Sequence, residues 1–259
     1  MSSSRLTIDS SKEAARIISF VRQTVEGAGA SGVVVGLSGG IDSAVVGAIC
    51  VKALGSAKVL GLLMPSKHTP REDIEDGKTL AKIWGTDSRL IRISGLVENF
   101  ERVAKSDGSR LAKANLQARL RMTLLYYFAN SMGRLVAGTG DKSEETIGFF
   151  TKWGDGGVDF LPIAHLYKTQ VRTLGSYLQL PERIVNKPAS PQLWAGHRAS
   201  DEIPVDYDKL DIILSSLIDE KRSRSEAASM AGVSVGVVER VLEMHRRSAH
   251  KRAMPPSLA

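Results

Sequence analysis

Hydrophobic and polar positions along the chain follow two alternating spacings. Over residues 9–28, apolar residues recur three to four positions apart and form one stripe, which predicts an amphipathic helix. A run of β-branched residues follows at 32–38, and its continuous apolarity predicts a strand buried on both faces. Two glycines then turn the chain into a second predicted helix over 41–54. The first unit of the chain therefore reads as helix, buried strand, turn and helix.

The same alternation continues through the first half of the chain. It predicts further strands at 58–64, 87–93 and 134–139, and helices at 70–84, from about 95, and at 109–132. Strands that alternate with helices imply right-handed crossovers and a parallel sheet covered on both sides. We therefore predict an α/β fold built on an open parallel sheet with helices on both faces.

The pattern changes after residue 140. Residues 141–165 are rich in Gly, Asp and Thr, which indicates a functional loop, and the chain beyond Tyr167 reads as mostly helical with prolines between the helices. We expect a single domain, with an α/β core at 1–165 and a helical C-terminal extension at 166–259.

Composition narrows the class of protein. A chain of 259 residues with 42% hydrophobic and 24% charged residues is typical of a folded domain, which excludes a disordered, collagen-like or small secreted chain. The net charge of +7 suits anionic partners, either nucleic acid or phosphorylated small molecules. A single cysteine excludes an intramolecular disulfide. No apolar run reaches the ~20 residues that span a bilayer, so we expect a cytoplasmic protein without a membrane segment.

The sharpest local feature is the turn Ser38-Gly39-Gly40-Ile41-Asp42-Ser43 between the first strand and the second helix. Glycines allow close backbone approach, and the start of a helix offers N–H groups and a positive dipole end, a combination that binds phosphate. Asp42 adds a carboxylate of the kind that holds Mg²⁺. The glycine spacing matches neither a Walker A loop nor a dinucleotide fingerprint.

A second cluster lies at the end of the fourth predicted strand. Thr139 and Gly140 stand where open α/β sheets bind ligands, and Glu144 follows near the start of a short predicted helix. Glu144 would complete a magnesium site with Asp42. Lys142, Lys152 and Lys168 are expected to bring positive charge to the same edge of the sheet.

Two resemblances add to this interpretation. SGGIDS resembles the pyrophosphate loop of the N-type ATP pyrophosphatases, which adenylate their substrates. GTGDKSEETIGFFTKWGDGGVDFLP, with KPASPQL and HKRAMPPS further on, is similar to the ammonia-dependent NAD synthetases over roughly residues 30–257. That family implies an adenine nucleotide alpha hydrolase-like fold, ATP as co-substrate and Mg²⁺ as cofactor. The implied reaction is amidation of deamido-NAD by ammonia through an acyl adenylate, with release of AMP and pyrophosphate.

The resemblance also implies roles for individual residues. ATP would contact Gly36, Leu37, Ser38, Gly39, Gly40, Ile41, Asp42, Ser43, Thr139, Lys168 and Ser190. Deamido-NAD would contact Arg119, Lys152, Asp159, His250 and Lys251. The metal ligands would be Asp42 and Glu144, and the catalytic groups Asp42, Lys168 and Asp159. Ser190 stands where Thr is frequent in the family, and His197-Arg198 stands where many members have Gly-Gln.

Alternatives of other classes share part of this pattern. A tRNA-modifying enzyme would share SGGIDS and use the basic charge, but such enzymes usually carry paired cysteines, a zinc module or an RNA-binding domain, which are missing here. A non-catalytic nucleotide-binding regulator would not need two magnesium carboxylates and a set of lysines. Ammonia would arrive free or from a separate protein, and Asp155 or Asp159 would deprotonate ammonium.

The predicted helix at 109–132 bears on assembly. Its apolar residues extend around more of the helix than one core-facing stripe needs. The excess suits either burial on two sides within one subunit or a symmetric interface. The NAD synthetases that this chain resembles are two-fold dimers, so we expect a homodimer that binds small molecules and no nucleic acid.

Overall fold

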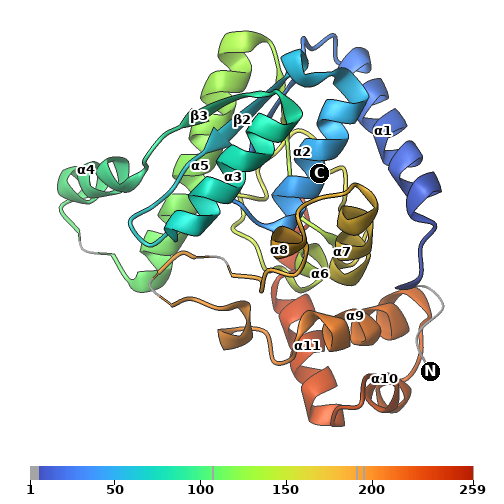
Figure 1. Ribbon diagram of the computed structural model, residues 1–259. Helices are drawn as coiled ribbons and strands as arrows, with labels where there is room; N and C mark the ends of the chain where they lie inside the picture. Colours follow the sequence, from blue (N-terminus) through green and yellow to red (C-terminus); the bar gives the residue numbers. More distant parts are fainter. Residues whose placement is uncertain (1–5, 107, 191, 195, 259) are drawn as a thin grey trace.

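A four-stranded parallel sheet forms the centre of the computed structural model, which describes residues 6–106, 108–190, 192–194 and 196–258. The strands are β1 Val33–Gly36, β2 Val59–Leu63, β3 Asp87–Leu90 and β4 Leu135–Ala137. Their order in the sheet is β3-β2-β1-β4, with all neighbours parallel (Figure 1). The predicted fold class is confirmed, and β1 and β4 are direct neighbours.

Helices cover both faces of the sheet and continue beyond it. They are α1 Ser10–Gly27, α2 Ile41–Leu54, α3 Arg71–Trp84, α4 Ser94–Ala104, α5 Arg110–Met132, α6 Lys142–Ile147, α7 Lys168–Tyr177, α8 Glu182–Val185, α9 Tyr207–Leu214, α10 Arg224–Ala231 and α11 Val235–Arg247. Short 3-10 turns lie at Ser56–Lys58, Ala199–Asp201 and Ala249–Lys251, and a π-helical turn at Ser215–Asp219 continues α9.

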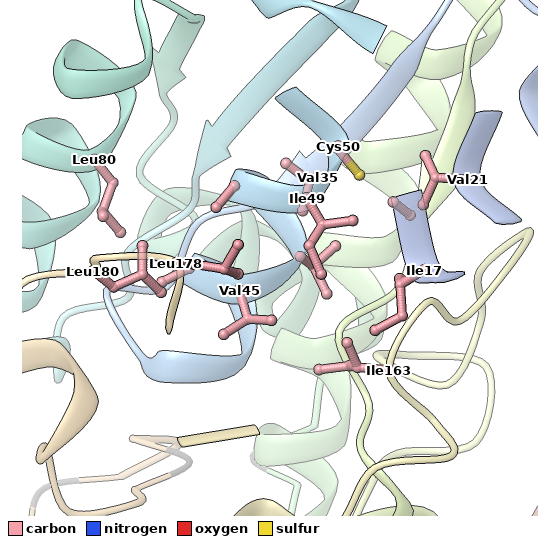
Figure 2. Packing of buried hydrophobic residues seen from close by; sticks show 14 of the residues in the cluster. Ile17, Val21, Val35, Val45, Ile49, Cys50, Leu80, Ile163, Leu178 and Leu180 are labelled. Atoms are coloured by element: carbon pink, nitrogen blue, oxygen red, sulfur yellow. The ribbon is translucent and has the colours of Figure 1, made fainter. Parts of the chain in front are cut away.

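Alternate residues of β1 face opposite sides of the sheet, as the geometry of a strand requires. Val33 and Val35 pack with α1, α2 and α7, whereas Val34 packs with α5. All three valines are buried, so the prediction of a strand covered on both faces is confirmed. Figure 2 shows Ile17 and Val21 of α1 approaching Ile49 and Cys50 of α2 in the larger of these cores.

Local signals in the sequence mark where the helices begin and end. The Asp9 side chain caps α1 by accepting a hydrogen bond from the Lys12 N–H, and Ser109 caps α5 in the same way. α5 ends at Gly133, whose φ of 60° is the left-handed conformation that glycine adopts readily. The predicted bounds of these helices therefore lie within a residue or two of those observed.

A separate hydrophobic cluster organises the C-terminal part of the chain. Helices α9, α10 and α11 pack together at one end of the molecule, against α6 and α7 (Figure 1). Because Ile147 and Tyr167 belong to this cluster, the loop region predicted at 141–165 contributes to it through α6. The organisation as a single domain divided near residue 165 stays a prediction. Within the described ranges, every helix is too short or too polar to cross a bilayer.

Candidate active site

The glycine turn, residues 38–43, connects the end of β1 to the first turn of α2. Gly39 has a φ of +80°, and a Cβ atom there would lie 2.3 Å from the Asp73 carbonyl oxygen. Only glycine fits this close approach. The N-cap residue Gly40 provides no capping side chain, so the first N–H groups of α2 are left to bind an anion.

Two serines fix the shape of the turn. The Ser43 hydroxyl accepts a hydrogen bond from the Ser38 N–H (3.2 Å) and donates to the Gly40 carbonyl (3.0 Å). The Ser38 hydroxyl accepts a hydrogen bond from the Gly40 N–H at 3.2 Å. Hydrogen bonds within the chain therefore shape the turn, a role of the two serines that was not predicted from the sequence.

A buried lysine lies beside this turn. The Lys168 ammonium is 2.7 Å from Asp42 Oδ2, 2.9 Å from Asp141 Oδ2 and 3.0 Å from Glu144 Oε1. These four residues, here called the lysine cluster, come from α2, the N-cap of α6, α6 and the start of α7. The Lys168 side chain is only 1% exposed. Three residues of the sequence prediction, Asp42, Glu144 and Lys168, are thus brought together.

The lysine cluster holds more negative than positive charge. Burial alone would lower the pKa of Lys168. The neighbouring carboxylates of Asp141, Asp42 and Glu144 outweigh this effect and raise the pKa well above its ordinary value. Burial, with the charges of Asp141 and Asp42, raises the pKa of Glu144 well above its ordinary value against the attraction of Lys168. One ammonium therefore faces three carboxylates, and keeping all three charged is costly without a further cation.

The donor set fits Mg²⁺. Asp42 Oδ1 is buried and has no hydrogen-bond partner among the described residues, so one carboxylate oxygen remains for a ligand. In the described ranges, no three His, Cys, Asp or Glu side chains are grouped to hold a metal without further ligands. Mg²⁺ typically takes one or two protein carboxylates and completes its shell with phosphate oxygens and water. Asp42 and Glu144 suit that mode of binding.

A second layer of residues positions Lys168. The Ser143 hydroxyl donates to Asp211 Oδ1 at 2.5 Å and accepts a hydrogen bond from the Lys168 N–H at 2.9 Å. Asp211 also accepts a hydrogen bond from the Thr169 N–H, so it holds the first turn of α7. The sequence interpretation missed this support and missed Asp141. In the sequence, Asp141 shows only as an N-cap, a role it also has by accepting a hydrogen bond from the Glu144 N–H.

A cavity of about 420 Å³ opens at the carboxyl ends of β1 and β4. Of the residues predicted to contact ATP, those that line it are Gly36, Leu37, Ser38, Gly40, Thr139 and Ser190. Glu144 also lines the wall and connects the cavity to the lysine cluster. The cavity is large enough for a nucleotide-sized ligand.

Four of the residues predicted to bind the dinucleotide lie close to one another beside this cavity. The Arg119 guanidinium donates to the Lys152 carbonyl (3.3 Å), and the Lys152 ammonium donates to the His250 carbonyl (2.5 Å). Lys251, next in the chain, lines the cavity and donates to the carbonyls of Gly148 and Phe150. Residues far apart in sequence therefore form one basic rim.

Other predicted residues lie elsewhere. Asp159 accepts hydrogen bonds from the Tyr126 hydroxyl (3.0 Å) and from the Val136 N–H (2.7 Å), and it is not among the residues that line the cavity. Lys142 pairs with Asp219 at 2.7 Å instead of pointing to the ligand edge. Of the three lysines expected at one edge, Lys168 therefore belongs to the lysine cluster and Lys152 to the basic rim, whereas Lys142 is paired with Asp219.

Two further residues line the cavity. Arg121 was not identified from the sequence, and Asp155 was named only as a base for ammonium. Arg121 donates from Nε to the Met64 carbonyl (3.1 Å), and it faces the cavity two residues from the predicted Arg119. Burial lowers the pKa of Arg121 to about 10, which leaves it charged at neutral pH. Asp155 lines the same cavity, and its carboxylate accepts a hydrogen bond from the Thr151 N–H at 2.9 Å. Arg119 and Arg121 belong to one helix, and their spacing alone did not show which of them faces the cavity.

Known proteins resemble this chain over almost its whole length. A family model described as NAD synthase matches residues 13–255. The NH(3)-dependent NAD(+) synthetase of Hyperthermus butylicus is 49% identical over 97% of this chain and 92% of its own length. The enzyme of that name from Archaeoglobus fulgidus is 48% identical over 93% of this chain and 94% of its own.

Solved structures agree with these relatives. The NMN synthetase of Francisella tularensis has a TM-score of 0.87 and 33% identity, over 97% of this chain and 99% of its own. The NH3-dependent NAD synthetase of Campylobacter jejuni has a TM-score of 0.82 and 29% identity, over 98% of this chain and 100% of its own.

Proposed function

The chain belongs to the NAD synthase family, and from this premise we propose that it amidates deamido-NAD with ammonia at the expense of ATP. The observation that carries the proposal is the lysine cluster, which lies beside the glycine turn and reaches the cavity wall through Glu144. It provides anion-binding N–H groups, two carboxylates suited to Mg²⁺ and a buried cation within one site. Relatives over almost the whole chain favour this activity over the tRNA-modifying alternative.

The reaction needs ATP because a carboxylate has no acceptable leaving group. An oxygen of the nicotinate carboxylate bonds to the α-phosphorus of ATP while the bond from that phosphorus to the bridging oxygen breaks, and pyrophosphate leaves. Ammonia then attacks the activated carbonyl carbon, AMP leaves with the electrons of the C–O bond, and the nitrogen loses a proton. Neither step requires a protein nucleophile, so catalysis is positioning and charge stabilisation.

The protein's groups fit these requirements. N–H groups of the glycine turn would bind the phosphates, and Lys168 would neutralise charge as pyrophosphate leaves. Asp42 and Glu144 would hold Mg²⁺, which supplies further neutralisation of phosphate charge when bound. Asp155 is better placed than Asp159 to accept a proton from ammonium, because of these two residues only Asp155 lines the cavity. Arg121 presents a cation to any anionic group of the bound substrates.

Product analysis tests the proposed reaction. The purified chain is incubated with deamido-NAD, ATP, Mg²⁺ and ammonium, and the products are separated and quantified by chromatography. We expect NAD, AMP and pyrophosphate in equal amounts. Glutamine in place of ammonium should give little product. Nicotinate mononucleotide belongs in a parallel assay, because one structural neighbour is described as an NMN synthetase. Formation of ADP and phosphate would contradict the adenylation chemistry.

We also propose a homodimer that acts in the cytoplasm, where ATP is available. Exposed apolar residues spaced three to four apart form a stripe on α4, namely Leu96, Phe100 and Val103. No residue of α4 is buried within the chain, and the adjoining α5 exposes Leu111 and Tyr127. An exposed apolar stripe of this kind is suited to a two-fold interface, in which the same surface of both subunits meets.

Light scattering tests the assembly. At low micromolar concentration the chain is expected to have twice its monomer mass, and Phe100→Asp with Val103→Lys should shift it toward the monomer because both changes place charge in the apolar stripe. Val235→Asp is the matched control, since Val235 is an exposed apolar residue of α11. A monomeric wild-type chain with full activity on dilution would refute the dimer.

A further inference from the structure

Lys187, which follows α8, connects the glycine turn to α3. Its ammonium donates to the Gly39 carbonyl at 2.9 Å, to Asp73 Oδ1 at 2.7 Å and to Asp76 Oδ2 at 2.5 Å. A lysine ammonium has three N–H donors. All three therefore have partners within the protein, although Lys187 is also one of the residues that line the cavity.

The anchor of this lysine is rigid. Asp73 and Asp76 are 3% and 5% exposed, and both lie on α3. Arg183 fixes Asp76 from the other side through a bond of 2.6 Å between Nε and Oδ1. Burial alone would lower the pKa of Lys187, but hydrogen bonds to Asp73 and Asp76 raise it above its ordinary value. The ammonium therefore stays charged at neutral pH. A charge-assisted bond thus reaches the glycine turn from a fixed position.

The contact with Gly39 sets the direction of one peptide group. In a trans peptide the C=O and the following N–H point in opposite directions, and the described chain has no cis peptide bond. With the Gly39 carbonyl held on Lys187, the Gly40 N–H points away from Lys187 and donates to the Ser38 hydroxyl. Ser38 and Gly40 both line the cavity.

Glycine makes this peptide easy to rotate. Gly39, at a φ of +80°, and Gly40 lack the side chains that would otherwise hinder a flip of the peptide between them. The flipped peptide would break the hydrogen bond from the Gly40 N–H to the Ser38 hydroxyl and turn a carbonyl oxygen toward Ser38, which lines the cavity. The hold on the Gly39 carbonyl therefore adds to the serine hydrogen bonds that shape the anion-binding turn.

We propose that Lys187 is a positioning residue that holds the Gly39–Gly40 peptide in its anion-binding orientation. It acts through the backbone of the turn and not by touching the nucleotide. The choice of ATP as the nucleotide rests on the proposed function. The role of Lys187 in phosphate binding itself does not require the amidation step.

Binding and kinetics of Lys187→Met test this role. ATP with Mg²⁺ is titrated into the free protein by calorimetry, so the measurement holds even if the proposed amidation fails. Loss of one charge-assisted hydrogen bond that orients the turn is expected to weaken ATP binding about tenfold. In steady-state assays, KM for ATP should rise by a similar factor while KM for deamido-NAD changes less than twofold.

Two further variants make the result decisive. Arg183→Met removes the other cation on Asp76 without touching the turn, and it should leave ATP binding unchanged. Since Lys187→Met leaves buried carboxylates uncompensated, Lys187→Met with Asp73→Asn is the alternative if the single variant fails to fold. Lys187→Arg should restore part of the affinity. ATP binding that is unchanged in a folded Lys187→Met variant, or equally weakened by Arg183→Met, would overturn the proposal.

Discussion

Lys168→Met is expected to abolish most of the activity and to lower the free energy of unfolding by about 3–5 kcal/mol, the usual effect of removing one partner from a buried ion pair. The ammonium contacts Asp42, Asp141 and Glu144, and without it their charges repel one another in a buried site. The rate should fall by about a hundredfold or more, because a positioned charge at the phosphates is lost.

Denaturant unfolding and steady-state kinetics measure the two effects of Lys168→Met separately. Lys142→Met is the matched control, since Lys142 is also a paired lysine near α6 but contacts Asp219 outside the cavity. The control should lose little activity. A Lys168→Met variant with wild-type stability would mean that the lysine is not needed to balance the carboxylates.

Glu144→Gln is expected to lower activity by about a hundredfold or more without loss of stability. Burial and the neighbouring carboxylates raise the pKa of Glu144 against the attraction of Lys168, so a charged side chain at this position costs the folded protein stability. A raised carboxyl pKa means that the folded state binds a proton more tightly than the unfolded state, and stability gained on protonation is lost as pH rises through the folded pKa. A permanently neutral side chain removes that cost at neutral pH.

The same variant tests the metal site. The Mg²⁺ concentration that gives half-maximal activity should rise for Glu144→Gln and for Asp42→Asn, because each removes a charged oxygen ligand. Glu145→Gln makes the same change one residue along without removing a contact to Lys168, and it should leave the Mg²⁺ requirement unchanged. Near-full activity of Glu144→Gln at limiting Mg²⁺ would exclude Glu144 as a ligand.

Sequence periodicity predicted the sheet and most helix bounds, because those depend on neighbours within a few residues. The third strand is an element whose bounds periodicity did not predict correctly. It was predicted over 87–93 but ends at Leu90, although the Ile91 and Ile93 N–H groups still donate to the Leu63 and Pro65 carbonyls at the end of β2. Backbone pairing with the neighbouring segment thus continues beyond the regular strand. The residue pattern alone cannot distinguish regular strand from such irregular pairing.

The site also contains local features that the sequence predicts and long-range contacts that it does not. The glycine turn is local, and its place between strand and helix was predicted. By contrast, Asp211 and Ser143 are 68 residues apart and meet only when α9 packs on α6 and α7. Lys187 and Asp73 are 114 residues apart, and although Lys187 begins the segment KPASPQL, nothing in the sequence links it to Asp73. Long-range pairs of this kind depend on tertiary packing, so a single sequence does not show them.

Cys50 gives the protein a built-in reporter of its own opening. It is the single cysteine, it is fully buried on α2, and burial raises the pKa of its thiol to about 12. Thiolate is the form that reacts with alkylating reagents, so labelling has to wait until α2 separates from the sheet. The rate of labelling therefore follows the population of opened molecules, and ligands that bind the native state slow it by mass action. Variants of the lysine cluster and of Lys187 can thus be compared without introducing a probe.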